Sequence, residues 1–398
     1  MPCTATKREA RAATAQRPLA LAVADADWFT TEHLFAEVRR PGVSTLLLSC
    51  LDYRNALRRG RFPRPWARRT VQRRSGLWHR ELVLPSGWMK SFPSWGMRPI
   101  RRAVEEWRAR HAPEGALALV MTYPHYLFLR DQLRPDYQLY FNIDDYSQYW
   151  PRRAATIHRL ERLAVREADL TVCVSALRCE ELRAAVPEAA DRIRHLPHGA
   201  AAAVLAREPQ HRPAPPPPDL AGLPRPILGY VGTLEDRMDW PLLRQVADAF
   251  PAASVVLIGR KARGGVRGWL TDYRRCLARP NVHAIGWRSQ EELGRYVSAF
   301  DVCLIPYRAD HPFNRVCCPT KIMDYMGSGR PIVSTDLPEC RLHDALFDVA
   351  ATAEGFLAAI ARIVAAGSDD GRAELRHAYA VDHSCARVVE RLLDWLPV

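Results

Sequence analysis

The chain has 398 residues, which is enough for two or three domains of ordinary size. Hydrophobic residues make up 48% and charged residues 25%, a globular composition that excludes a largely disordered or fibrous protein. No apolar run reaches the roughly 18 residues that a membrane-spanning helix needs, so an integral membrane protein is not expected. The N-terminus is basic and runs into the short apolar stretch LALAVA, which is too short for a signal peptide, so we interpret the first 18 residues as a loose leader.

Ten cysteines are scattered along the chain without a C-x-x-C pair. Most lie in apolar stretches, where cysteine packs as a small hydrophobe. The adjacent residues Cys317 and Cys318 have a poor spacing for a tetrahedral metal site. The sequence therefore predicts a reduced, cytoplasmic protein without a structural metal.

The positive charge is concentrated in one segment. The net charge is +13, and residues 54–110 alone hold sixteen Arg or Lys, three Glu and five Trp. Basic residues mixed with aromatic ones suit an anionic membrane surface, an acidic ligand or nucleic acid, but no zinc-finger or RRM signature supports nucleic acid. An arginine-rich genome is the alternative, because only four of the 57 cations are lysines. We predict no nucleic-acid partner, and we expect the segment to bind the anionic inner face of a membrane peripherally.

Short apolar segments alternate with amphipathic ones, which indicates parallel sheets covered by helices. The predicted strands are 19–26, 44–50, 116–124, 137–145, 170–175, 193–199, 226–233, 253–259, 281–286, 301–307 and 331–335. The predicted helices are 125–133, 152–169, 176–187, 241–250, 289–300, 319–329 and 386–396. Residues 51–115 show no clear period.

A proline-rich segment separates the two halves of the chain. Residues 209–226 hold eight prolines in eighteen positions, so they favour stiff polyproline II over a helix or a central strand. We therefore predict an N-terminal Rossmann-like domain over 1–208 and a linker over 209–226. A C-terminal Rossmann-like domain would follow over 227–378, and a last helical segment, 379–398, would pack back toward the N-terminal domain.

Glycine ends three of the predicted strands, at Gly232, Gly259 and Gly286. The carboxyl ends of parallel strands form the edge where ligands bind in an open α/β sheet. In the first of these turns, Thr233 follows the glycine and Arg237 offers a charge for a phosphate. Glycine is also common in such turns for steric reasons alone. The pattern is not G-x-G-x-x-G, so a nicotinamide dinucleotide is not predicted.

The helix predicted over 319–329 carries the strongest chemical signal. Lys321 lies at its N-terminus, where free N–H groups favour a phosphate. Asp324 follows three residues later, on the same face and about 5 Å along the axis. A carboxylate one turn from a diphosphate would suit the two hydroxyls of a ribose. The alternative is an ordinary surface Lys–Asp pair, and spacing alone does not decide between them.

The second half resembles the donor-binding domain of retaining "group 1" glycosyltransferases of the family 4-like type, which have the GT-B fold. The matching segments are GYVGTLEDRMDW, VVLIGR, NVHAIGW with SQEELGRYVSAFDVCLIPY, and PTKIMDYMGSGRPIVST. In the first half, VCVSALRCEEL and RHLPHGA are similar to the end of the family's first domain. The resemblance spans about residues 116–398 and is strongest over 226–335.

The resemblance implies an α/β protein of GT-B architecture, with two Rossmann-like domains facing across a cleft. It implies that the C-terminal domain holds a nucleotide-sugar. Gly232 and Arg237 would face the diphosphate, Lys321 would meet phosphate, and Asp324 would bind the ribose. Trp287, directly after Gly286, would lie by the base. With Thr233 and Gly259 these residues form the predicted donor site.

The chain departs from the family pattern at two positions. The family has a glutamate where this chain has Asp324, which is one methylene shorter. The partner acid, eight residues earlier, falls on Val316, which binds neither a sugar hydroxyl nor a cation. Asp310, His311 and Asn314 are nearby substitutes.

Two adjacent acids, Asp144 and Asp145, follow a predicted strand of the N-terminal half, where the family has a His or His-Asp facing the reacting sugar. One of them would orient an acceptor hydroxyl or stabilise positive charge at the anomeric carbon. Neighbouring side chains on an extended chain point in opposite directions, so at most one faces the sugar. The alternative to a catalytic role is that one of the two acids caps the segment that follows. His125 is a second candidate, and a purely structural histidine is its alternative.

Together these features predict a glycosyltransferase that moves a sugar from a UDP- or GDP-sugar to a saccharide or lipid-linked acceptor. Retention of configuration is expected, and the setting would be cell-surface polysaccharide or glycoconjugate synthesis. The predicted catalytic residues are Asp144, Asp145, His125, Arg237 and Lys321. We expect no metal or other cofactor, because the two cations would neutralise the leaving diphosphate. The alternatives are a sugar-nucleotide epimerase, an inverting transferase, or a non-catalytic nucleotide-sugar-binding subunit.

Overall fold

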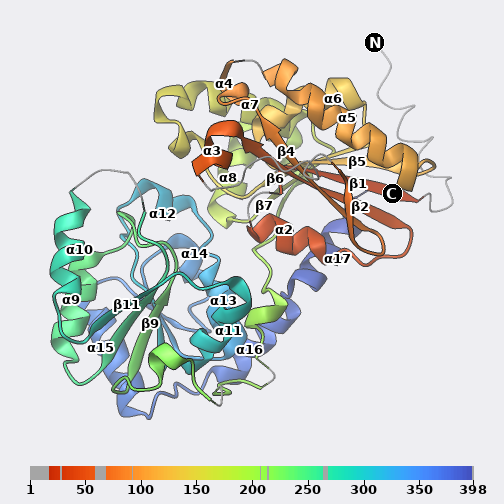
Figure 1. Ribbon diagram of the computed structural model, residues 1–398. Coiled ribbons are helices and arrows are strands. Elements are labelled where there is room, and N and C mark those ends of the chain that lie inside the picture. The colour runs from red at the N-terminus through yellow and green to blue at the C-terminus, as the bar shows by residue number, and fades with distance from the viewer. Residues whose placement is uncertain are drawn as a thin grey trace.

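A computed structural model describes residues 18–26, 29–58, 69–91, 93–206, 208–212, 215–262 and 268–396. The chain forms two α/β domains, one above the other in Figure 1. Each domain has its own apolar core around its own sheet. Mixed α/β architecture with two largely parallel sheets is therefore confirmed.

The N-terminal sheet has eight strands in the order β3-β4-β2-β1-β5-β6-β7-β8. All neighbouring strands are parallel except β3, which runs antiparallel to β4. The strands are β1 (Leu19–Ala24), β2 (Val43–Asp52), β3 (Val71–Arg74), β4 (Leu77–Leu84), β5 (Ala116–Met121), β6 (Tyr137–Asn142), β7 (Leu170–Cys173) and β8 (Ile193–His195). Strand β1 is buried along its whole length, as expected for a central strand covered on both faces.

The C-terminal sheet has six parallel strands in the order β11-β10-β9-β12-β13-β14. The strands are β9 (Ile227–Val231), β10 (Ser254–Ile258), β11 (Val282–Gly286), β12 (Val302–Ile305), β13 (Ile332–Thr335) and β14 (Asp348–Ala350). This is the doubly wound order, with the switch point between β9 and β12. Ligands bind such sheets at the carboxyl ends of the strands beside that point.

Helices surround both sheets (Figure 1). In the N-terminal half they are α2 (Phe29–Ala36), α3 (Tyr53–Arg58), α4 (Trp88–Ser91), α5 (Pro93–His111), α6 (Leu127–Leu133), α7 (Ala154–Glu167) and α8 (Ala176–Ala185). In the C-terminal half they are α9 (Trp240–Ala249), α10 (Trp269–Leu277), α11 (Gln290–Ala299), α12 (Pro312–Val316), α13 (Lys321–Ser328), α14 (Pro338–Arg341), α15 (Ala353–Ala365), α16 (Ala373–Asp382) and α17 (Cys385–Asp394).

The segment without a clear period, residues 51–115, contains three helices and a β-hairpin among its described residues. The hairpin joins β3 to β4 through Gly76, whose φ of +74° favours glycine. Several predicted strands are shorter in the structure, because a strand ends where its backbone no longer forms hydrogen bonds with a neighbouring strand. The strand predicted over 137–145 ends at Asn142. Asp144 and Asp145 therefore lie on the loop beyond its carboxyl end.

The last helix, α17, lies against the N-terminal domain. It packs on α2, and its Val388, Val389 and Leu392 belong to the N-terminal core. On its outer side Arg40 forms an ion pair with Glu390 at 2.8 Å. The chain therefore crosses between the domains twice, once in each direction. No helix of the described residues is both long and apolar enough to cross a membrane.

Candidate functional site

Three glycines at the carboxyl edge of the C-terminal sheet bring adjacent turns into backbone contact. Gly232 donates its N–H to the carbonyl of Ile258 at 2.9 Å, and Gly259 donates to Gly286 at the same distance. A Cβ on Gly259 would lie 1.8 Å from the carbonyl oxygen of Gly232, and φ at both residues is near +150°. Close approach therefore requires glycine at both positions.

Lys321 lies at the start of α13, beside the Gly232 turn. A Cβ at position 232 would lie 3.4 Å from the Cε of Lys321. The lysine side chain is only 5% exposed, and its Nζ donates to the hydroxyl of Tyr307. The Nζ also lies 4.2 Å from the centre of the Tyr307 ring and 5.2 Å from that of Tyr230. Two aromatic rings thus hold a desolvated cation at the edge of the sheet.

Asp324 lies one turn further along α13. Burial raises the pKa of its carboxyl to about 7, although the charge of Lys321 opposes the shift. No hydrogen bond or ion pair joins the Asp324 carboxylate to any described residue. The alternative of a surface Lys–Asp pair is therefore wrong, because Lys321 is buried and bonded to Tyr307 instead. An unpartnered carboxylate of this kind favours a hydroxylated ligand.

Arg237 lies on the loop that follows β9. Its Nε donates to Glu235 at 2.7 Å, and its guanidinium carbon stacks 4.3 Å from the centre of the Phe313 ring. Arg237 is therefore already paired with an acid, which the sequence did not suggest. Thr233 is exposed beside it, and its carbonyl accepts a hydrogen bond from the hydroxyl of Tyr230.

Asp144 and Asp145 have different partners. The Asp145 carboxylate accepts from the backbone N–H of Ser147 at 3.0 Å, from the Ser147 hydroxyl at 2.6 Å and from Gln148 at 3.1 Å. It thereby caps the 3-10 helix Tyr146–Tyr149. Its own turn occupies this carboxylate, so Asp144 is the stronger catalytic candidate of the two.

Asp144 points toward the C-terminal domain. Burial raises its pKa to about 6, while the Tyr149 hydroxyl and the charge of Arg237 act in the opposite direction. Tyr149 donates to the Asp144 carboxylate at 2.6 Å, and its ring contacts Phe313 edge-on at 5.5 Å between centres. Asp144, Tyr149, Phe313 and Arg237 therefore form a continuous series of contacts from one domain to the other.

His125 is buried at the turn after β5. Its ring packs edge-on against Trp150 at 5.5 Å between centres, and its Nδ1 has no hydrogen-bond partner among the described residues. Burial, reinforced by the charge of Arg153, lowers the pKa of His125 to about 4. The imidazole is therefore neutral at pH 7 and has a free ring nitrogen.

Trp287 stands at the carboxyl end of β11. Its ring is 56% exposed, and the guanidinium of Arg260 lies 4.6 Å from its centre. An exposed aromatic face beside a cation is a suitable stacking surface for a base. Trp287 and Lys321 follow different strands of one parallel sheet, so they lie along the same edge.

The three substitutes considered for the acid missing at Val316 serve the local fold. Asp310 pairs with Arg308 at 2.8 Å, and the Nδ1 of His311 caps α12 by accepting from Phe313. The amide of Asn314 donates to the carbonyl oxygens of Arg237 and Arg308, at 2.9 Å each. The Asp310 carboxylate and the His311 Nδ1 are therefore occupied, whereas the buried Oδ1 of Asn314 has no hydrogen-bond partner among the described residues.

Four aromatic residues of the site were not predicted from the sequence. Tyr230 and Tyr307 hold Lys321, while Tyr149 and Phe313 join the domains. The only signal for Tyr149 was its position five residues after Asp144. Aromatic side chains are ordinary core residues in most sequences, so nothing in the pattern separated these four from the rest.

A buried glutamate also joins the two domains. Glu339 of α14 accepts a hydrogen bond from the backbone N–H of Ala176, the first residue of α8, at 3.0 Å. Its other oxygen lies 3.4 Å from Nε2 of His195. A carboxylate at a helix N-terminus is favourable, so this contact ties α14 to the N-terminal domain.

No cluster of three or more His, Cys, Asp or Glu suited to a metal ion occurs among the residues that the structure describes. The site instead presents two cations and the N-terminus of α13.

Comparisons with known proteins give a family match for part of the chain and a fold for all of it. Residues 225–366 match the family of glycosyl transferases group 1. The Thermosynechococcus elongatus sucrose-phosphate synthase shares the fold at a TM-score of 0.70, with 16% identity over 94% of this chain and 98% of that one. Anabaena HepE, solved with UDP and glucose, shares the fold at a TM-score of 0.62. The identity is 14%, over 95% of this chain and 99% of HepE. Residues 225–366 therefore resemble the group 1 glycosyltransferases, and the chain as a whole has the GT-B fold.

A curated relative of this chain is TuaH of Bacillus subtilis (strain 168), which is named a putative teichuronic acid biosynthesis glycosyltransferase. It is 23% identical over 248 residues. The alignment covers 61% of this chain and spans 58% of the length of TuaH.

The buried cation Lys321 provides a first prediction. Lys321→Met keeps the bulk of the side chain and removes its charge. A charged hydrogen bond contributes about 1.5–3 kcal/mol. For whichever of UDP and GDP binds the wild type more tightly, the Kd should therefore rise about 10- to 100-fold. Calorimetric titration measures this change. Arg362→Met, which removes an exposed cation of α15, is the matched control and should bind as the wild type does. Equal affinity in the Lys321 variant and the control would contradict the site.

Proposed function

We propose that this protein transfers a hexosyl group from a UDP- or GDP-sugar to a saccharide or lipid-linked acceptor, with retention, in the synthesis of a cell-surface polysaccharide. The observation that carries the proposal is the arrangement of Lys321 and Asp324 on α13. A desolvated cation lies beside the Gly232–Gly259 contact, and an unpartnered carboxylate follows one turn later. That arrangement suits a diphosphate followed by a ribose.

In this proposal each donor group has a place along the edge of the C-terminal sheet. The diphosphate lies over the Gly232 turn, between Arg237 and the N-terminus of α13, where backbone N–H groups add to the charge of Lys321. The ribose hydroxyls bind Asp324, and the base stacks on the exposed face of Trp287. The backbone at Gly232 and Gly259 lets the diphosphate approach without a side chain between.

The chemical step breaks the bond between the anomeric carbon and the diphosphate oxygen. Negative charge develops on the leaving diphosphate, and Arg237 and Lys321 are placed to stabilise it. Positive charge develops on the sugar, and the Asp144 carboxylate is the candidate to stabilise it from the opposite domain. The acceptor oxygen forms the new bond to the anomeric carbon, and its proton passes to the leaving diphosphate oxygen.

Known proteins support the choice of donor and product. The HepE structures are described as complexes with UDP, with UDP-glucose, and with UDP and glucose. TuaH is named a putative glycosyltransferase of teichuronic acid biosynthesis. These properties belong to those proteins, and they favour a UDP-sugar and a polysaccharide product here.

The absence of an acid at position 316 favours one competing function, a subunit that binds a nucleotide-sugar without catalysis. Donor hydrolysis separates the two. A transferase releases UDP or GDP from its own donor sugar slowly in the absence of acceptor, whereas a binding subunit leaves the donor intact. Release that disappears in Asp144→Asn would assign it to this site.

A thermal-shift panel with UDP, GDP and ADP tests the donor site. We expect one of the three to stabilise the protein without added metal, because arginine, lysine and helix N–H groups bind the diphosphate. At a nucleotide concentration of a hundredfold over Kd the free energy of unfolding should rise by about 2.7 kcal/mol. The same shift should appear in the presence of EDTA. A shift that requires Mg²⁺, or no shift with any of the three, would overturn the proposal.

A further inference from the structure

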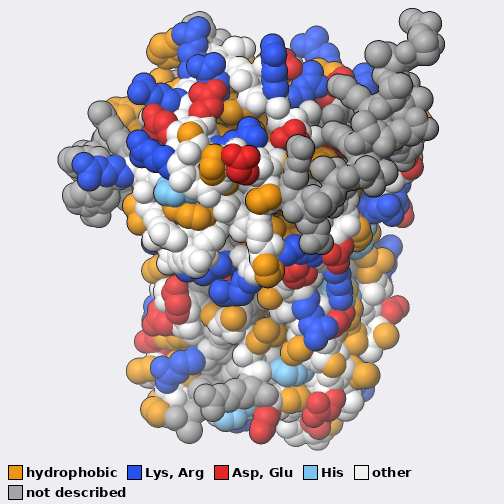
Figure 2. Space-filling view, turned by 90° about the vertical axis from the view of Figure 1, so that its right-hand side faces the viewer, with side chains coloured by type: hydrophobic (Ala, Val, Ile, Leu, Met, Phe, Trp, Pro, Cys, Tyr) orange, Lys and Arg blue, Asp and Glu red, His pale blue; other side chains and the backbone are white. Residues whose placement is uncertain are grey.

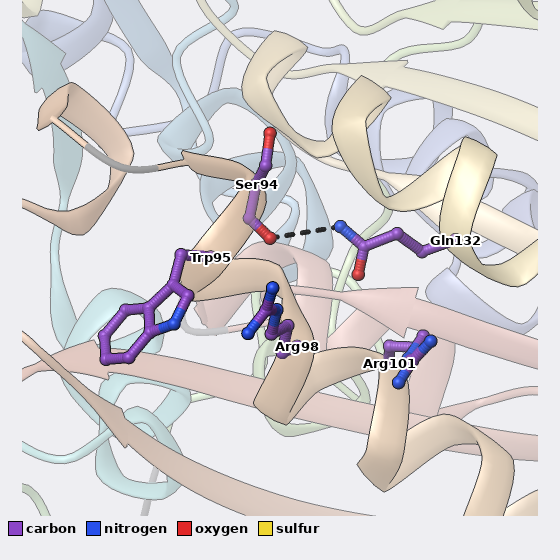
Figure 3. Close-up of a pocket in the computed structure, with 5 residues that line it drawn as sticks. All are labelled: Ser94, Trp95, Arg98, Arg101 and Gln132. Atoms are coloured by element: carbon purple, nitrogen blue, oxygen red, sulfur yellow. Dashed lines mark hydrogen bonds between the residues drawn. The ribbon is translucent and has the colours of Figure 1, made fainter.

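A stripe of exposed side chains runs along the first half of α5. Trp95, Arg98 and Arg101 follow one another at three-residue intervals, so they lie on one face of the helix. They line a surface hollow of about 400 Å³ together with Ser94 and Gln132. Figure 3 shows the three side chains along the helix, and the amide of Gln132 in α6 donating to the carbonyl of Ser94 at 3.1 Å.

The stripe contributes nothing to the core. The opposite face of α5 carries the buried residues Met97, Ile100, Val104 and Trp107, which pack on the N-terminal sheet. Trp95, in contrast, is 59% exposed, the most exposed large hydrophobic side chain in the described part of the chain. Leaving so much indole surface in water loses the stabilisation that burial would provide. A single exposed tryptophan is common on protein surfaces, so the case for a partner rests on the cations that lie beside this one.

The two arginines of the stripe are also largely without partners. Arg98 forms no hydrogen bond or ion pair with any described residue. The nearest acid to Arg101 is Glu105, 3.8 Å away, and the Nε of Arg101 is buried without a hydrogen-bond acceptor. The neighbouring Arg102, in contrast, is paired with Glu106 at 2.8 Å. Arg98, which has no acidic partner among the described residues, and Arg101, which has only this long ion pair, therefore favour an anionic partner.

The combination of side chains identifies the chemistry of that partner. Arginine binds phosphate groups, and tryptophan prefers the boundary between lipid headgroups and acyl chains. A free phosphate would need the arginines but not an exposed indole. Helix α5 as a whole carries five Arg and two Glu, and Figure 2 shows Lys and Arg side chains gathered at the upper end of the N-terminal domain. A positively charged surface with an apolar anchor suits an anionic bilayer.

We propose that α5 docks on a bilayer of anionic phospholipids, with Trp95 in the interface and with Arg98 and Arg101 on headgroup phosphates. Helix α5 follows β4, and β4 is parallel to the strands that lead to Asp144. Docking would therefore place the carboxyl edge of the N-terminal sheet near the membrane, where a lipid-linked acceptor is found. The proposal does not depend on the identity of the donor nucleotide.

Vesicle co-sedimentation of the full-length chain tests the docking surface. The probes are vesicles of pure phosphatidylcholine and vesicles with about one third phosphatidylglycerol. Wild-type protein should bind the anionic vesicles at 50 mM NaCl and release them at 500 mM, where charges are screened beyond about 4 Å. The double variant Arg98→Ala/Arg101→Ala should bind about 25-fold more weakly, at roughly fivefold for each arginine. Trp95→Ala should also bind more weakly, and its remaining binding should stay salt-sensitive.

Arg110→Ala is the matched control, because it removes an exposed cation from the far end of the same helix. It should change vesicle affinity less than fivefold. All variants should keep the wild-type melting temperature and the wild-type shift with nucleotide, which separates this test from that of the donor site. Equal binding to neutral and anionic vesicles would overturn the proposal, as would an undiminished affinity in the double variant. Displacement of bound protein by 10 mM inorganic phosphate at constant ionic strength would assign the arginines to a free anion instead.

Discussion

Asp144→Asn should lower kcat by at least about 10²-fold while the Kd of the nucleotide stays close to that of the wild type. The substitution keeps the shape of the side chain and removes the negative charge that would stabilise the sugar in the transition state. Asparagine still accepts the hydrogen bond of Tyr149, so the contacts between the domains are retained. Initial rates of nucleotide release from the donor sugar, with and without acceptor, measure the effect.

The pH dependence gives the Asp144 prediction a second readout. Because burial raises the pKa of Asp144 to about 6, kcat/KM of the wild type should fall as the pH drops below about 6, where the carboxylate takes up a proton. This acid limb should disappear in Asp144→Asn. The folded-state pKa lies above the usual value near 3.8, so ionised Asp144 costs stability, and this cost appears as the pH rises from about 4 through 6. The Asn variant should therefore be at least as stable as the wild type at pH 8.

Asp145→Asn is the control for Asp144, since it changes the neighbouring carboxylate. Its effect should fall on stability, because Asp145 holds the turn at Ser147 and Gln148. Wild-type turnover in both variants would contradict the catalytic model of the N-terminal domain. His125, with its neutral ring and free Nδ1, would then be the next residue to test.

Glu161→Leu should destabilise the N-terminal domain by about 3 kcal/mol. The buried Glu161 carboxylate accepts from Tyr140 at 3.0 Å, from Asn142 at 2.9 Å and from Arg178 at 2.7 Å. Leucine would leave all three donors without this acceptor, and breaking a buried ion pair costs about 3–5 kcal/mol. We expect the lower end of that range, because Arg178 keeps its second partner Glu181 at 2.5 Å. The midpoint of urea unfolding, followed by tryptophan fluorescence, measures the loss.

Two further variants test whether the Glu161 effect arises from the unpaired charge. Glu181→Leu removes the half-exposed partner of the same arginine and should cost about 1 kcal/mol or less. The double variant Glu161→Leu/Arg178→Leu should recover part of the loss, since no charge is then left unpaired. The losses in the free energy of unfolding of Glu161→Leu and Arg178→Leu are added and compared with the loss in the double variant. A larger loss in the double variant would mean that the network acts through packing and not through charge.

The sequence by itself determined the fold class, and it predicted which residues form the candidate donor site. Buried parallel strands are continuous apolar runs, and amphipathic helices carry a period of 3.6, so both are visible in a single chain. Gly232, Gly259 and Gly286 were recognisable because only glycine allows the backbone contacts at the ends of these strands. The spacing of Lys321 and Asp324 placed both on one helical turn, because helix geometry depends only on local sequence.

Only the tertiary structure decided how these residues are held and which of them point at one another. Tyr307 lies 14 positions from Lys321, and Glu339 lies 163 positions from its partner Ala176. Asp144 and Asp145 are chemically equal in the sequence, and the difference comes from Tyr149 on one side and Ser147 on the other. The packing of whole domains decides which side chains are buried. It buries Asp144, whose pKa rises, and it leaves Trp95 exposed. Such contacts join residues far apart in the chain, so no local period or spacing encodes them.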